Sequence, residues 1–390
     1  MIKMLTAHTS EMDFVDDAVS EVLQQLNLDE VADPRRAVGI ITCHTEFVQT
    51  GVVKALCEHL PFPVVGCTTL GSAASGEGGH HLMAVSVLTG DDVEFSSALS
   101  ETISPDNVGE TIRDAYNRAL AGLATPSPAL VLVFAPFMNA VDGMSMFSQI
   151  DLNCGDAPLY GTLSCSGNAD LSGSLTIWNG DAARDVMAIV MIRGNVKPRF
   201  FLTALSDDRM GKKKGTTTDS DGPLIRTVDG VAAIDFIESC GITKETVIRA
   251  PSSIPVMIDY QDGSAPLACG IYNITPEGFL RVGANVPVGA KFSIGMRDIS
   301  GILSTAESLL RQIGSETKPR GILMLPCLSR SLLLGANSEG ELRLAVKELG
   351  DAAPYHIAYS GGEICPVCVE DGKTRNRFHN FTFTACVFDS

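Results

Sequence analysis

The chain has 390 residues, 45% of them hydrophobic, which is enough for two domains around a sizeable core. Its 29 basic and 46 acidic residues give a net charge of −17 spread along the sequence, so electrostatic repulsion argues against nucleic acid or anionic membranes as partners. No window approaches the roughly 20 apolar residues that cross a bilayer. The N-terminus also lacks an apolar signal core, and the eleven cysteines are scattered, as in a reducing compartment. We therefore expect a cytoplasmic protein.

The N-terminal part alternates between helical and strand patterns. Ser10 and Asp13 resemble a capping box before a helix in which apolar residues recur at helical spacing from Phe14 to Leu26. Expected strands and helices follow in the order strand 37–43, helix 46–59, strands 63–66 and 82–88, helix 107–122. Such alternation is typical of a layered α/β protein.

The same local pattern occurs three times. Each copy has an apolar strand, an amphipathic stretch, a short strand entered by proline, a loop of small residues and an apolar closing strand. The closing strands are 82–90, 186–194 and 381–389. The sequence therefore predicts an α/β fold of layered αβ units repeated about three times.

The polar segment 207–223 combines a lysine run with threonine and glycine and ends in a Gly-Pro break. It is the best candidate for a boundary, with domains at 1–206 and 224–390 and a linker or exposed loop between them; a hairpin tip within one domain is the alternative. Beyond it we expect a short helix, consecutive strands over 270–298 and a helix from 300 to 313. Ser338 and Glu341 form a further capping box.

Several segments together resemble the FIST (F-box and intracellular signal transduction) family, with both its N-terminal and C-terminal domains. They are PVVGCTTLG, PLYGTLSCSGNA, VDGVAAIDFI, EGFLRVGANVPVGAKFSI and the closing run LPCLSRSLLLG to HNFT. The resemblance covers nearly the whole chain in the family's order. It departs from the family in the third loop, where a Tyr-Gly-Glu turn is replaced by Ser360-Gly361-Gly362-Glu363.

The resemblance implies an intracellular sensor that binds a small molecule, such as an amino acid, and acts in signal transduction. Many members carry an attached output domain, so we expect this chain to regulate a separate protein such as a histidine kinase, a cyclase or a chemoreceptor. Some members bind haem and sense nitric oxide in two-component systems, which makes haem a possible cofactor here. No CxxCH motif occurs, so haem would be held non-covalently by one of seven histidines.

Candidate ligand-binding residues follow from the expected topology, because open α/β sheets place ligands at the carboxyl ends of their parallel strands. The corresponding loops supply Cys67, Thr68, Thr69, Gly71, Ser164, Cys165, Asn168, Ser329, Arg330, Ser360, Gly361, Gly362 and Glu363. Arg330 and Glu363 could clamp the carboxylate and ammonium of a zwitterion, in which case Arg330→Ala abolishes binding with little loss of stability. Alternatively, the two side chains pair with each other structurally.

An enzyme is the rival class, with Cys327 as a conceivable nucleophile. No nucleophile elbow, phosphate-binding loop, dinucleotide fingerprint or zinc-protease motif is present, so no catalytic or metal-binding residue is predicted. Cys365 and Cys368 form a CxxC without the second pair that a four-cysteine zinc site requires. They are better explained as two cysteines at the end of a strand.

Overall fold

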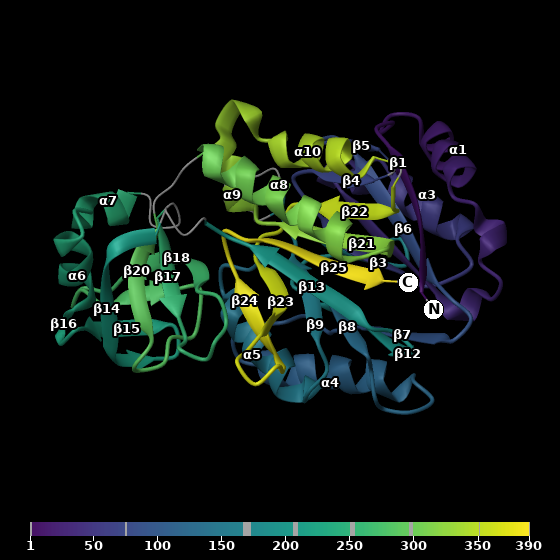
Figure 1. Cartoon of the computed structure of the whole chain (residues 1–390). Coiled ribbons are helices and arrows are strands. Elements are labelled where there is room, and N and C mark those ends of the chain that lie inside the picture. Colours follow the sequence, from purple (N-terminus) through teal and green to yellow (C-terminus); the bar gives the residue numbers. More distant parts are fainter. Residues whose placement is uncertain are drawn as a thin grey trace.

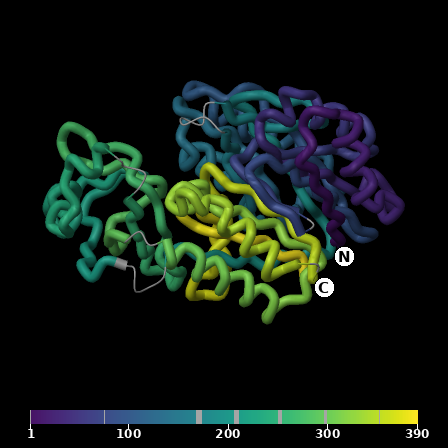
Figure 2. Tube along the Cα trace, turned by 90° about the horizontal axis from the view of Figure 1, so that it is seen from above, coloured from purple at the N-terminus to yellow at the C-terminus, as the bar shows by residue number. Residues whose placement is uncertain are grey.

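The computed structural model describes residues 2–74, 76–166, 173–205, 210–249, 254–295, 299–350 and 352–389. A body of three αβ units stands beside a separate β-rich domain, and the two chain ends lie close together on the far side of the body (Figures 1 and 2). None of the helices in these ranges is long and apolar enough to cross a membrane.

The first unit occupies residues 3–89. Its elements are β1 (Lys3–Thr9), α1 (Val15–Gln25), the short helices η1 (Leu28–Glu30) and η2 (Pro34–Arg36), β2 (Ala37–Cys43), α2 (Thr45–Gln49), α3 (Val52–His59), β3 (Val64–Thr68), β4 (Ser72–Ala74), β5 (Glu77–Gly79) and β6 (Met83–Thr89). The expected first helix is present, but the Glu11 carboxylate accepts the backbone N–H groups of Asp13 and Phe14 at its start, in place of a Ser10 capping box.

The second unit repeats this order over residues 93–194. It contains β7 (Val93–Leu99), α4 (Val108–Ala121), β8 (Leu130–Ala135), α5 (Gly143–Cys154), β9 (Leu159–Leu163), β10 (Thr176–Trp178), β11 (Asp181–Ala183) and β12 (Ala188–Gly194). The Asp142 carboxylate accepts the backbone N–H of Ser145 at 2.8 Å and so caps α5.

The third unit is divided by the β-rich domain. β13 (Pro198–Thr203) precedes that domain, and the rest follows it: α8 (Ile299–Glu316), β21 (Pro319–Pro326), α9 (Leu328–Leu334), η5 (Gly335–Asn337), α10 (Gly340–Leu349), β22 (Tyr355–Ala358), β23 (Glu363–Cys368), β24 (Thr374–His379) and β25 (Phe383–Asp389). Cys365 and Cys368 both lie in β23, with Cys365 buried and Cys368 exposed, as expected for cysteines of a strand.

Each unit builds its sheet by the same rule. The central strand (β2, β8 or β21) pairs in parallel with the next strand (β3, β9 or β22) and antiparallel with the closing strand (β6, β12 or β25). The closing strand also pairs with an edge strand (β1, β7 or β13). The strand orders are β1-β6-β2-β3, β7-β12-β8-β9 and β13-β25-β21-β22. The threefold repetition expected from the sequence is therefore present in the fold, and helices cover the outer side of the body (Figure 1).

The units also exchange hairpins in a cycle. The β10–β11 hairpin of the second unit extends the first sheet at β3, β23–β24 of the third unit extends the second sheet at β9, and β4–β5 of the first unit extends the third sheet at β22. Every sheet thus ends on backbone supplied by another unit. Because these ladders join distant parts of the chain, the three units fold into one body.

The β-rich domain lies between β13 and α8 in the sequence. Its elements are β14 (Met210–Asp221), β15 (Leu224–Val228), β16 (Val231–Ala232), α6 (Ala233–Ser239), α7 (Lys244–Arg249), β17 (Pro255–Asp259), β18 (Leu267–Ile274), β19 (Leu280–Val282) and β20 (Lys291–Gly295). The pairing order β14-β20-β17-β18-β19-β15 is closed by β14 pairing with β15, which makes a barrel around its own apolar core. Residues 210–221, expected as a linker or exposed loop, form β14, and residues 207–209 lie outside the described ranges.

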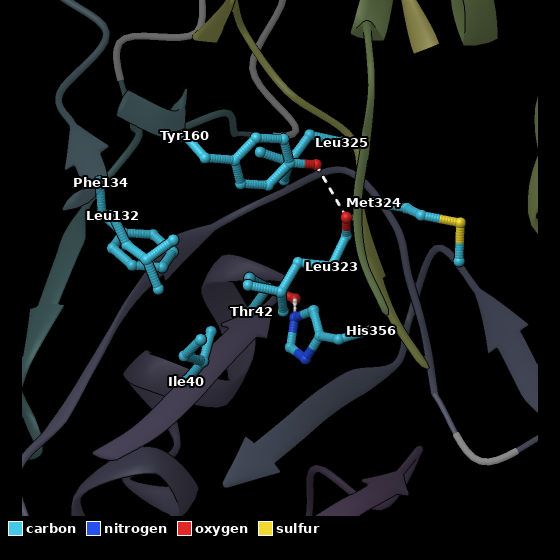
Figure 3. Close-up of a pocket in the computed structure, with 10 residues that line it drawn as sticks. Ile40, Thr42, Leu132, Phe134, Tyr160, Leu323, Met324, Leu325 and His356 are labelled. Carbon is cyan, nitrogen blue, oxygen red and sulfur yellow. Dashed lines mark hydrogen bonds between the residues drawn. The ribbon is translucent and has the colours of Figure 1, made fainter. Parts of the chain in front are cut away.

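The inner faces of the three sheets meet in one apolar core. The strands β2, β8 and β21 carry buried apolar residues at matching positions in this core, namely Ile40, Leu132 and Leu323. A cavity of about 20 Å³ lies between the units, close to the size of one water molecule (Figure 3). The imidazole of His356 lies in this centre. Its ring nitrogens form hydrogen bonds with the hydroxyls of Thr42 at 2.8 Å and Ser86 at 2.7 Å. The centre of the body is therefore a packed core with no room for a ligand.

Candidate functional site

A cleft of about 690 Å³ separates the barrel from the body, where the third unit meets the second. A volume of this size is typical of small-molecule sites, and interfaces between domains are a common place for them. It is lined by residues of the loop 137–143, of the barrel strands β18 and β19, of α9 and of the loops after β22 and β24.

The carboxyl ends of the third unit's parallel strands form the floor of the cleft. Cys327 follows β21 and Ser360 follows β22, and a parallel bridge joins the two residues. The N–H of Leu328 donates to the carbonyl of Ser360 at 2.8 Å, which places α9 directly over the strand ends. Ser329, in the first turn of α9, and Gly361 complete this floor.

The barrel supplies the opposite wall. Tyr272 donates a hydrogen bond from its hydroxyl to Asn380 Oδ1 at 2.9 Å, across the two domains. The Arg281 side chain, on β19, is exposed at the cleft and makes no hydrogen bond or ion pair with the described residues. Phe381, in the left-handed region with φ of 57°, packs its ring with Met257 and Ala268 of the barrel. Among the described residues, the cleft therefore offers aromatic surface and the unpaired guanidinium of Arg281.

A buried carboxyl group lies behind the floor. Glu363 Oε2 accepts a hydrogen bond from Thr382 at 2.7 Å, whereas Oε1 has no hydrogen-bond partner among the described residues. The Cys327 and Ser360 side chains lie near this carboxyl group. Burial raises the pKa of the Glu363 carboxyl to about 8, against the lowering effect of the Thr382 hydrogen bond. Burial, reinforced by Glu363, also raises the pKa of the Cys327 thiol, which disfavours the thiolate that a nucleophile needs.

The family follows from comparison with known proteins. A model described as the FIST N domain matches residues 37–231, and one described as the FIST C domain matches residues 237–366. The chain belongs to the FIST family. FIST domains are associated with the sensing of small ligands in signal transduction.

Solved structures similar to this FIST protein are distant. Cyanuric acid hydrolase from A. caulinodans is 10% identical with a TM-score of 0.40, and the match covers 100% of this chain and 99% of that one. PurLQS from Thermotoga maritima is 10% identical with a TM-score of 0.20, over 100% and 72% of the two chains. Neither similarity is close enough to inform the function. No curated protein matches the chain.

The predicted ligand residues of the FIST protein fall into separate places. Ser329, Ser360 and Gly361 line the cleft.

Other predicted residues lie between the units. Thr69, Ser164 and Ser360 are equivalent, since the N–H of each donates at 2.8 Å to the carbonyl of the last residue of β2, β8 or β21. The predicted residues Thr68, Thr69, Ser164 and Cys165 are buried where the units meet. The Cys165 N–H donates to the Thr68 carbonyl, and the Thr69 hydroxyl donates to the Tyr359 carbonyl. Cys67 and Gly71 are buried with them, Gly362 packs against Phe378, and Asn168 lies outside the described residues.

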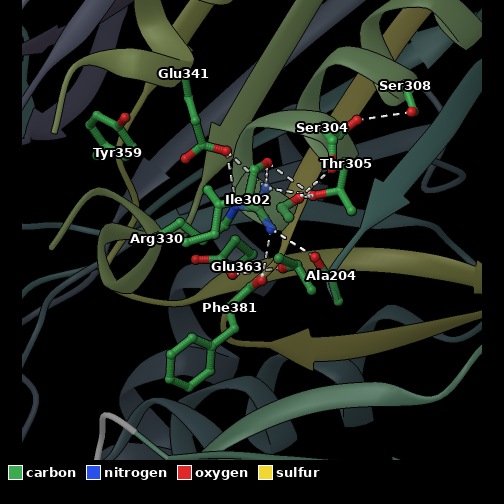
Figure 4. A network of polar contacts seen from close by, with 12 residues as sticks. Ala204, Ile302, Ser304, Thr305, Ser308, Arg330, Glu341, Tyr359, Glu363 and Phe381 are labelled. Atoms are coloured by element: carbon green, nitrogen blue, oxygen red, sulfur yellow. Dashed lines mark hydrogen bonds and ion pairs between the residues drawn. The ribbon is translucent and has the colours of Figure 1, made fainter. Parts of the chain in front are cut away.

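Arg330 is placed differently from either expectation. Its partner is Glu341, not Glu363: both Nε and Nη2 lie 2.9 Å from Glu341 Oε1 (Figure 4). Its remaining donors bond to the carbonyls of Ala204, Phe381 and Ile302 and to the Thr305 hydroxyl. The side chain is 1% exposed and all its donors are used. Arg330 therefore ties α9 to α8, α10 and the chain before the barrel, and has no donor left for a ligand.

Haem does not fit the cleft well. Histidine is a common axial ligand of haem iron, and no histidine is among the described residues that line the cleft. His356 and His379 are buried and hydrogen-bonded elsewhere, in the central core and to the Cys365 carbonyl.

The residues that the barrel and the second unit contribute to the cleft were not predicted from the sequence. They include Tyr272 and Arg281 of the barrel and the loop after β8, which contains Phe137. All of them are distant in sequence from Cys327 and Ser360. Of these, the loop after β8 has a recognisable signal in the sequence, because it follows the carboxyl end of a parallel strand.

Proposed function

We propose that this FIST protein binds a small carboxylate-bearing molecule in the cleft between barrel and body, and that binding changes its contact with a separate signalling protein. The observation that carries the proposal is the 690 Å³ cleft itself, which joins two domains of a family associated with small-ligand sensing. The body and barrel each contribute aromatic surface to it.

The charges at the cleft favour an acidic ligand. Among the described lining residues the charged side chains are Arg281 and Asp142, and the Asp142 carboxylate already accepts from the N–H and hydroxyl of Ser145. The Arg281 side chain has no such partner among the residues that the structure describes, so it is available for a bidentate contact with a carboxylate. An amino acid fits this proposal, with Arg281 in the role that the sequence assigned to Arg330.

Signalling requires that the ligand favour one arrangement of the two domains over another. Polar contacts hold the barrel on the body beside the apolar packing of Phe381: Tyr272 bonds to Asn380, and Asp262 pairs with Arg377 at 2.8 Å. The Arg377 guanidinium also stacks on Tyr260 at 4.3 Å. Interfaces of this kind allow domain motion. A ligand that bridges Arg281 and the Ser360 loop pulls the barrel toward the body.

A thermal-shift screen of amino acids and small carboxylic acids tests the binding. Small-angle scattering with the best compound tests the motion, and the proposal predicts a smaller radius of gyration at saturation. An unchanged scattering curve and an unchanged affinity for the partner, with a compound shown to saturate the protein, contradict the signalling step.

The haem-based nitric-oxide sensor is the alternative. It predicts a Soret band in the purified protein or after hemin titration, which shifts with nitric oxide under anaerobic conditions. A protein that stays colourless with added hemin removes this alternative and leaves the carboxylate ligand.

A further inference from the structure

The first unit carries polar residues where the third unit has its cleft. Thr42 pairs with Ala84 in the first sheet as Leu325 pairs with Thr384 in the third. Counting from these pairs, the residues that match Cys327, Ser329 and Phe381 of the cleft are His44, Glu46 and His81. The same strand-end position therefore carries different chemistry in the first and third units.

These three side chains converge. Glu46 Oε2 lies 3.5 Å from His44 Nδ1 and 3.8 Å from His81 Nδ1. The imidazole rings stand edge to face with their centroids 4.9 Å apart, and the three ligand atoms all lie within 4.8 Å of one another. Two donors bound tetrahedrally at ~2.1 Å to one ion stand about 3.4 Å apart, so the spacing is that of ligands around a metal.

The environment of His44 points in the same direction. Its Nδ1 is shielded from solvent and has no hydrogen-bond partner among the described residues, although a buried ring nitrogen normally has one. Glu46 and His81 are 50% and 63% exposed, so an ion can reach the site from solvent. The neighbouring His80 is already held, by the Leu70 carbonyl at 2.6 Å and the Ser338 hydroxyl at 2.8 Å. His80 therefore fixes the loop that presents His81.

We propose that His44, Glu46 and His81 bind one divalent first-row transition-metal ion, with Zn²⁺ as the representative. Imidazole and carboxylate are the ligands such ions take, and three protein ligands leave a coordination position open for water or a further ligand. The ion joins the β2–α2 turn to the loop between β5 and β6. This site is separate from the cleft and does not depend on the proposed function.

The test is a titration of the full chain, stripped of metal by chelation, with Zn²⁺ by calorimetry and with Co²⁺ by absorbance. His81→Ala and Glu46→Gln alter exposed side chains and so should leave the fold intact, and His59→Ala on α3 is a matched exposed-histidine control. The wild type and His59→Ala should bind one ion per chain. The two site variants should bind it at least about 100-fold more weakly, since even outer-shell losses cost up to that much.

The visible Co²⁺ spectrum is the second readout. A bound Co²⁺ with imidazole and carboxylate ligands gives intense ligand-field bands, which His81→Ala should weaken or shift while His59→Ala leaves them unchanged. Equal affinity and equal spectra in the wild type and the site variants, or no one-to-one binding by the wild type, would overturn the proposal and leave Glu46 as an ordinary ion-pair partner of two histidines.

Discussion

Arg330 and Glu341 form an ion pair in the interior of the third unit, with the guanidinium 2.9 Å from the carboxylate and neither side chain more than 1% exposed. Desolvation raises the pKa of the Glu341 carboxyl, and the adjacent guanidinium lowers it. Three backbone carbonyls and the Thr305 hydroxyl complete the surroundings of the guanidinium. The pair therefore belongs to the framework that holds α9 over the cleft.

Replacing Arg330 with alanine should lower the free energy of unfolding by about 3–5 kcal/mol, because it leaves the Glu341 carboxyl buried without its partner. Denaturant unfolding monitored by circular dichroism measures this loss. Arg343→Ala, which removes an exposed ion pair with Glu339, is the control and should cost no more than ~1 kcal/mol. An Arg330→Ala protein as stable as the wild type that no longer binds ligand would restore the ligand-clamp hypothesis.

Glu363 should make the protein less stable as pH rises from about 4.5 to 8. Its pKa is raised to about 8 by burial, so across that window the folded state holds a proton that the unfolded state has released. The slope approaches ~1.4 kcal/mol per pH unit for one proton. Glu363→Gln should flatten this component, and Glu58→Gln on the surface of α3 should not. Parallel pH profiles for wild type and Glu363→Gln would mean that the carboxyl is ionised in the fold.

His356 should produce the opposite dependence at lower pH. Desolvation lowers the pKa of its imidazole to about 3, so between about 6.5 and 3 the unfolded state binds a proton that the folded state excludes. The free energy of unfolding should therefore fall as the pH drops through this range. His356→Gln should lose that acid sensitivity while the exposed His59→Gln keeps it, as read from urea midpoints at pH 4, 5 and 7. Identical acid profiles in all three proteins would refute a buried neutral imidazole.

Arg281 should control the affinity for acidic ligands without controlling stability. Its side chain is exposed and unpaired among the described residues, so Arg281→Ala should leave the melting temperature nearly unchanged. Loss of a charged hydrogen bond worth about 1.5–3 kcal/mol should weaken a carboxylate ligand roughly 10- to 100-fold. Arg281→Lys should recover part of this, and the distant Arg113→Ala should have no effect. Calorimetry with the best compound of the screen decides between these outcomes.

The threefold pattern of the fold could be predicted from sequence because three runs of apolar strands repeat with similar lengths. The exchange of hairpins could not, since strands such as β4 and β10 have three residues each and are defined by partners in another unit. Likewise β14 is rich in lysine and threonine and resembled a linker. Among residues 211–221 of β14, whose burial is described, only Gly215 and Thr217 are buried. The strand therefore lacks the strong apolar alternation by which strands are recognised.

The cleft could be predicted in part. The strand-end position of Ser329, Ser360 and Gly361 could be predicted from the sequence, and the carboxyl ends of the third unit's parallel strands do form the floor. The equivalent residues Thr69 and Ser164 could not be distinguished from them, because their burial depends on the neighbouring units. Glu341 was expected to cap its helix, and instead turns inward to Arg330, a pairing that only the packing of α9 against α10 creates.

The most direct test of ligand binding in the cleft is the thermal-shift screen repeated on two tryptophan variants. Ser329→Trp fills the floor of the cleft, and Ser20→Trp places the same side chain on the exposed face of α1 as a control. At least one amino acid or small carboxylic acid should raise the melting temperature of the wild type and of Ser20→Trp but not that of Ser329→Trp. A compound that stabilises all three proteins equally, or a full panel that stabilises none of them, would contradict the account.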